Sequence, residues 1–105
     1  MDIDSLQARA VEIAQLYDRT HIEAGRRAWG TSDLALGFVG DVGDLAKLVQ
    51  AVNGRREIPD AEARLGHELA DCLWSVLVLA DRYGIDLTAE FTHMTDELER
   101  HLDAR

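Results

Sequence analysis

Two pairs of acidic residues, each pair spaced three positions apart, are the residues of this chain best suited to chemistry. Asp41 and Asp44 form the first pair, and Glu68 and Asp71 form the second. Side chains at this spacing project from one face of a helix. Two such helices facing each other would gather four carboxylates, which repel one another unless a cation lies between them. All four are therefore candidate ligands for Mg²⁺, with Mn²⁺ as an alternative, because hard cations prefer oxygen ligands.

The spacing of these acidic residues can also arise by chance, because 20 of the 105 residues are Asp or Glu. Two other acidic pairs with the same spacing occur, one in a connector that contains proline and one in a polar stretch near residue 97. The pairs at 41/44 and 68/71 differ from them in having aliphatic and aromatic neighbours. Such neighbours predict a buried helical setting, which disfavours unpaired carboxylates and favours a bound cation.

Length and composition predict one globular domain over residues 1–105. The chain is 47% hydrophobic and 30% charged, with a net charge of −9. So negative a chain is not expected to bind nucleic acid, which requires a basic surface. The longest apolar stretch, 72–80, is too short to span a membrane, and the acidic start does not resemble a signal peptide. With a single cysteine, Cys72, the chain has no internal disulfide, and we expect a cytoplasmic protein.

Apolar residues recur at helical spacing throughout, and no segment alternates as a strand does. Capping and glycine signals predict four helices: one over residues 3–24, one from a cap among Thr31, Ser32 and Asp33 to about residue 52, one opened by Pro59 and Asp60 and running to residue 83, and one capped by Asp86 or Thr88. Because the connectors are short, neighbouring helices should be antiparallel. We therefore predict an all-α, four-helix up-down bundle. Gly37, Gly40 and Gly43 would let another helix approach the second helix closely.

Three stretches carry a resemblance to a known family: 36–47 (LGFVGDVGDLAK), 67–74 (HELADCLW) and 79–87 (LADRYGIDL). Over roughly residues 20–90 the chain resembles the all-α nucleoside triphosphate pyrophosphohydrolases, the MazG-like group related to dimeric dUTPases. In that family, Glu-x-x-Glu on one helix and Glu-x-x-Asp on the next bind Mg²⁺. Water then attacks the α-phosphorus of a nucleoside triphosphate, which yields a monophosphate and pyrophosphate. The resemblance also implies a homodimer or homotetramer, which the wide apolar surface of the third helix favours independently.

The resemblance aligns Asp41 and Asp44 with the first family motif, where they are the expected catalytic pair, and Glu68 and Asp71 with the second. This chain departs from the family in having the shorter aspartate twice, and in having Gly40 where relatives often have another glutamate. Relatives often carry Lys and Asn on the last helix to bind the nucleotide, and here that stretch offers His93 and a glutamate. Metal binding is therefore expected to persist more securely than triphosphate cleavage.

Four further residues are candidates for contacts with the substrate. Lys47 lies three residues after Asp44 and would either pair with that carboxylate or reach a phosphate. Arg27 would contact phosphates or remain a solvated loop charge. Trp29 would stack on a base or cover one end of the bundle, and Trp74 would line a pocket, form a subunit contact or pack in the core.

Two functions follow from these observations. The first is a Mg²⁺-dependent pyrophosphohydrolase that acts on a nucleoside or deoxynucleoside triphosphate and clears aberrant nucleotides. The second is a catalytically degenerate bundle of the same family that acts as a nucleotide-binding or oligomerising module. A basic side chain that reaches the acidic residues from outside the last helix would favour the enzyme.

Overall fold

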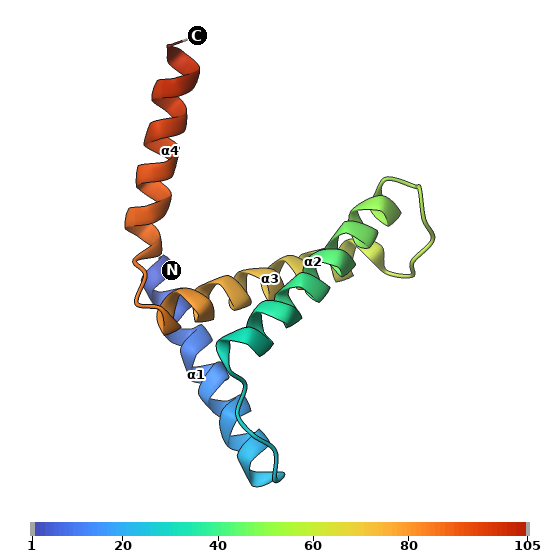
Figure 1. Ribbon diagram of the computed structural model, residues 1–105. Coiled ribbons are helices and arrows are strands. Elements are labelled where there is room, and N and C mark those ends of the chain that lie inside the picture. Colours follow the sequence, from blue (N-terminus) through green and yellow to red (C-terminus); the bar gives the residue numbers. More distant parts are fainter. Residues whose placement is uncertain (1, 105) are drawn as a thin grey trace.

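The computed structural model describes residues 2–104 and consists of four α-helices (Figure 1). Their bounds are α1, Ile3–Glu23; α2, Thr31–Val52; α3, Ala61–Arg82; and α4, Leu87–Asp103. No strand occurs within this part of the chain. The predicted all-α class and the number of helices are confirmed. None of the four helices is long and apolar enough to cross a membrane.

The helix ends follow local capping chemistry, with one difference from the prediction, at the start of α2. As predicted, α1 ends before Gly25, which has a φ of 77°, and α4 is capped by Asp86, whose carboxylate accepts the Ala89 N–H at 3.1 Å. The cap of α2 is Gly30 instead of one of the three polar residues after it. Asp33 lies inside the first turn of α2, and its carboxylate accepts a hydrogen bond from the Gly30 N–H at 2.9 Å. This hydrogen bond links a side chain within the helix to the backbone of the cap residue, and it stabilises the helix start. As predicted, Asp60 opens α3: it is the N-cap residue, and the helix begins at Ala61.

The packed part of the chain is formed by the first three helices. α2 and α3 run side by side and antiparallel, and α1 packs across α3 near its C-terminal half (Figure 1). The core is small and contains five buried residues, of which two are alanines: Ala10, Ala14, Leu34, Leu77 and Val78. The indole N–H of Trp74 donates to the Ala10 carbonyl at 3.2 Å, which fixes α3 against α1.

α4 extends away from the other helices after its first turns (Figure 1). Leu87 at its start packs against the core, but no residue of this helix is buried. The radius of gyration is 16.9 Å, whereas a closed domain of this length has about 13 Å. Within one chain, therefore, α1, α2 and α3 pack together, and the up-down bundle of four helices is left open.

The three glycines of α2 do not bring another helix close within the chain. A Cβ atom added at Gly37, Gly40 or Gly43 would meet no atom of the described chain within 4 Å, apart from its own helix. The expectation that these glycines let another helix approach α2 closely is therefore wrong for the packing within residues 2–104. α2 and α3 meet instead through the helix face that carries buried Leu34 and Leu48.

Candidate metal centre and adjoining cavities

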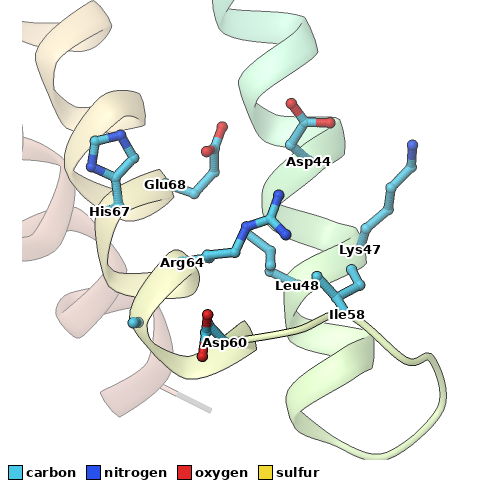
Figure 2. Close-up of a pocket in the computed structure, with 9 residues that line it drawn as sticks. Asp44, Lys47, Leu48, Ile58, Asp60, Arg64, His67 and Glu68 are labelled. Atoms are coloured by element: carbon cyan, nitrogen blue, oxygen red, sulfur yellow. The ribbon is translucent and has the colours of Figure 1, made fainter.

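The Asp41/Asp44 pair and Glu68 meet where α2 packs against α3. One carboxylate oxygen each from Asp41, Asp44 and Glu68 lies within 4.8 Å of the others. Figure 2 shows Asp44 on α2 and Glu68 on α3 directed into the space between the two helices. The spacing of three residues puts Asp41 and Asp44 on the face of α2 that meets α3, so residues far apart in the sequence form one acidic group.

Asp71, the fourth expected ligand, is not a member of this group. Its carboxylate lies 3.3 Å from the Nε2 atom of His67, one helical turn earlier on α3. The spacing of four residues makes these two side chains neighbours on the helix surface. Asp71 nevertheless remains near enough for its charge to affect Glu68. The structure therefore gathers three of the four expected ligands and turns the fourth toward an imidazole.

Electrostatics at the acidic group favour a cation. The pKa of Glu68 is raised, first by burial and then by the charges of Asp41, Asp71 and Asp44. The adjacent Cys72 thiol also has a raised pKa, through burial and the charges of Asp41 and Glu68. Both shifts mark a place where an additional negative charge is unfavourable. A thiol with a raised pKa is a poor nucleophile, which agrees with Cys72 as a packing residue.

The donor set of Asp41, Asp44 and Glu68 fits a small divalent cation. Octahedral Mg²⁺ has metal–oxygen bonds of about 2.1 Å, so its ligand oxygens lie roughly 3 to 4 Å apart. The three carboxylates, at up to 4.8 Å, reach such positions through small side-chain rotations. They supply three of six ligand positions, which leaves the others for water and phosphate oxygens, as is usual for Mg²⁺.

The setting of the acidic group is more open than the sequence predicts. Asp41 and Glu68 are half-buried, and Asp44 is exposed. Among the apolar neighbours, Val39 is 67% exposed and Leu69 is 53% exposed. The prediction of a buried helical setting is therefore wrong for one chain, because no other helix within residues 2–104 covers that side.

A cavity of about 580 Å³ opens beside the acidic group, between α2, the α2–α3 connector and the start of α3. Its polar lining combines three carboxylates, those of Asp44, Asp60 and Glu68, with the basic residues Lys47, Arg64 and His67 (Figure 2). Lys47 lines the same cavity as Asp44, but within residues 2–104 the two side chains form no ion pair, and its contact with a phosphate stays a prediction. Sequence reasoning missed Arg64, although its position four residues before Glu68 predicts a side chain on the same helix face.

A cluster of aromatic side chains lies between α1 and α3, next to Asp71. Tyr17 on α1 stacks on Trp29, with ring centroids 6.1 Å apart, and meets Trp74 edge to face at 5.8 Å. A second cavity, of about 310 Å³, lies between α1 and α3 and is lined by Tyr17, Asp71 and Trp74 among others. Trp74 therefore both packs against α1 and lines a pocket. Tyr17 is a further residue that sequence reasoning missed, because its spacing marks only an apolar helix face.

The remaining candidates are engaged elsewhere. Arg27 donates two hydrogen bonds to the Asp33 carboxylate, at 2.8 and 3.2 Å, and these raise the Arg27 pKa. His93 on α4 lies 3.3 Å from Glu97 and lines neither cavity of its own chain. Neither side chain therefore reaches the acidic group within one chain.

Comparisons with family models, with curated proteins and with solved structures found no match to this chain. The interpretation of the site therefore depends on the residues and their geometry.

Proposed function

We propose that this chain is a Mg²⁺-dependent nucleoside triphosphate pyrophosphohydrolase of the MazG-like type, which releases a monophosphate and pyrophosphate. The observation that carries the proposal is the convergence of Asp41, Asp44 and Glu68 beside a cavity with basic side chains. Carboxylates alone attract cations of many kinds. Carboxylates next to Lys47 and Arg64 match a ligand that is itself anionic and carries a cation, and a triphosphate with Mg²⁺ is such a ligand.

The position of each acidic residue indicates its role in the proposed reaction. Asp41, Asp44 and Glu68 would hold the cation, whose positive charge would offset phosphate charge and make a bound water easier to deprotonate. Asp44 is the exposed member of the group, so it is best placed to accept a proton from an attacking water molecule. Asp71, held by His67, orients water or completes the donor set after a side-chain rotation.

The nucleoside lies on the aromatic side of the acidic group in this proposal. The cavity between α1 and α3 offers the rings of Tyr17 and Trp74 next to Asp71. Aromatic rings bind bases by stacking, which contributes about 1–3 kcal/mol per base and tolerates different bases. Trp29 stacks on Tyr17 and supports that ring.

We further propose that the protein acts as a homodimer or homotetramer in which a second copy covers α4. The exposed face of α4 carries large apolar side chains at helical spacing: Phe91, Met94, Leu98 and Leu102. In proteins, most of the stability of a helix comes from packing of its apolar face, and such a face is normally buried against another helix. Open apolar surface also lies along α2, where Leu36 is 72% exposed beside the three glycines. Association of two copies closes the bundle that one chain leaves open.

A panel of nucleoside and deoxynucleoside triphosphates tests the proposed activity. Each compound is incubated with the protein and Mg²⁺ or Mn²⁺, and pyrophosphate and orthophosphate are measured separately. The proposal predicts pyrophosphate release that chelator stops and that Asp41→Asn abolishes. Release of orthophosphate and a diphosphate as the first products would contradict it. Exposed Asp103→Asn on α4 is the matched control and should retain activity.

A further inference from the structure

One arginine at the end of α3 links three segments of the chain. Arg82 donates a hydrogen bond from its Nη1 atom to the Trp29 carbonyl at 2.8 Å, and its Nη2 atom lies 3.7 Å from the Asp18 carboxylate on α1. Trp29 belongs to the connector that returns along α1 to the start of α2 (Figure 1). A single guanidinium group therefore joins α1, the connector and α3.

The ion pair of Arg82 and Asp18 is better shielded from water than the other ion pairs of residues 2–104. Its side chains are 26% and 31% exposed, whereas each of the other pairs has at least one side chain that is more than 60% exposed. Exposed pairs contribute little, because water screens them. Arginine also presents its donors in a rigid planar fork, so a guanidinium held by Asp18 presents its other donor to Trp29 in a fixed direction.

The connector has few other polar contacts at this point. Among the hydrogen bonds within residues 2–104, the one from Arg82 is the only one made to the backbone of residues 27–29. Backbone groups without partners in the protein bond to water, and such a segment opens readily. The position of Trp29 therefore depends on Arg82 and on the packing of the indole ring.

Trp29 carries the ring that supports the aromatic cluster. The indole stacks on Tyr17 with 9° between the ring planes, and the centroid of the His21 ring is 5.3 Å away. Because Trp29 is 40% exposed, packing alone restrains it incompletely. Tyr17 in turn lines the cavity between α1 and α3. A displacement of Trp29 would therefore reach that cavity through Tyr17.

We propose that Arg82 is a positioning residue, which holds Trp29 on Tyr17 and thereby fixes the aromatic wall of the cavity between α1 and α3. The proposal rests on the function proposed above, which assigns the nucleoside to that cavity. Arg82 itself lines neither this cavity nor the one beside the acidic group. Its effect passes through the Trp29 carbonyl, so its loss should change the affinity for the nucleoside.

Fluorine NMR of the full chain labelled with 5-fluorotryptophan tests the positioning without any ligand. The chain has two tryptophans, and Trp29→Phe identifies the resonance of Trp29. Arg82→Met keeps the aliphatic stem but removes the donors, so the Trp29 resonance should move toward that of solvent-exposed fluorotryptophan. The Trp74 resonance should stay in place, because the hydrogen bond to the Ala10 carbonyl holds that ring.

Two further variants separate positioning from a general effect on the fold. Arg82→Lys keeps the charge but loses the paired donors, so its Trp29 resonance should lie between those of the parent and Arg82→Met. Arg19→Met on α1 is the matched control, because Arg19 is exposed and forms no ion pair within residues 2–104. Both of its tryptophan resonances should match the parent's. A parent-like spectrum of Arg82→Met, or equal movement of both its resonances, would overturn the proposal.

Calorimetric titration with the common deoxynucleoside monophosphates and Mg²⁺ measures the consequence for the cavity. Trp29→Ala should weaken binding about threefold or more, because base–aromatic stacking contributes a factor of about five or more. Arg82→Met should weaken it by a similar factor. If Arg82 acts through Trp29, the double variant should bind no more weakly than Trp29→Ala alone. Losses that multiply would overturn the proposal.

The two measurements distinguish failure of this proposal from failure of the proposed function. If the Trp29 resonance depends on Arg82 but no nucleotide binds or is cleaved, the positioning role stands and the proposed function fails. If a triphosphate is cleaved but Arg82→Met has the spectrum and the affinity of the parent, the activity stands and the positioning role fails.

Discussion

Asp41 of α2 and Glu68 of α3 present carboxylate oxygens to each other within 4.8 Å. After burial, the charge of Asp41 is the largest cause of the raised pKa of Glu68. Two carboxylates so close together are unfavourable at neutral pH unless a cation or a proton lies between them. This one relationship connects the stability of the protein with its proposed metal binding.

Glu68→Gln should raise the melting temperature of the cation-free protein at pH 7 by a few degrees. Because the folded pKa of Glu68 lies above its unfolded value, its favourable contribution is present at acidic pH and is lost as pH rises through the folded pKa. The glutamine side chain of the Glu68→Gln variant carries no charge, so the variant does not lose this stability as pH rises. Mg²⁺ or Mn²⁺ should raise the melting temperature of the parent but not that of the variant. Identical melting of the parent in cation and in chelator would argue against the site.

Asp33 should show the opposite dependence on pH. The hydrogen bonds from Arg27, and then that from the Gly30 N–H, lower its pKa, so the stability it contributes is present at neutral pH and is lost as pH falls through the folded pKa. Asp33→Asn should therefore melt below the parent at pH 7, with a gap that narrows in acid. Arg27→Ala should reproduce part of this loss, and the double variant should be no worse than Asp33→Asn. Additive losses would show that the two side chains act independently.

Lengthening both acids of α2 should impair the proposed activity. Asp41→Glu combined with Asp44→Glu adds one methylene to each ligand and moves their oxygens past the positions that face Glu68. Because a displacement of about 1 Å can cost about 100-fold in rate, turnover of the triphosphate should fall roughly 10- to 100-fold. An inactive parent together with an active double variant would instead identify a degenerate site that the family's glutamates restore.

Leu98→Asp should disrupt self-association through α4. The substitution places a charge in the middle of the exposed apolar face of this helix, which is unfavourable when a second copy covers it. Light scattering should report a larger fraction of monomer, and circular dichroism should report a lower helix content. Glu99→Gln, on the neighbouring position of the same helix, is the control and should leave the assembly intact. A parent that is monomeric at all concentrations would contradict the proposed homodimer or homotetramer.

Much of the fold follows from the sequence, because helical spacing and end signals are local. Gly25 and Asp86 mark the ends of helices through their own conformation or side chain. The contact between the 41/44 pair and Glu68 was also predictable, since short connectors make neighbouring helices antiparallel. The position of α4 was not, because nothing in its own residues specifies which surface covers Leu98.

The site was predictable only in part, for a related reason. Asp71 belongs to the expected pattern, but its side chain has a nearer partner in His67, and a rotamer choice of this kind depends on local competition. Arg64, in contrast, was not expected at the site, but the structure places it there. Its charge alone does not distinguish it from the arginines of the loops, and only the packing of α2 on α3 makes it part of a cavity.

Hydrolysis of a triphosphate in water labelled with ¹⁸O tests the central claim most directly. If water attacks the α-phosphorus at the group formed by Asp41, Asp44 and Glu68, the label should appear in the nucleoside monophosphate, and pyrophosphate should be unlabelled. The reaction should require Mg²⁺ or Mn²⁺ and should be lost in Glu68→Gln. Label in pyrophosphate or orthophosphate, or no cleavage of any triphosphate with either cation, would contradict the account and favour a nucleotide-binding or oligomerising module.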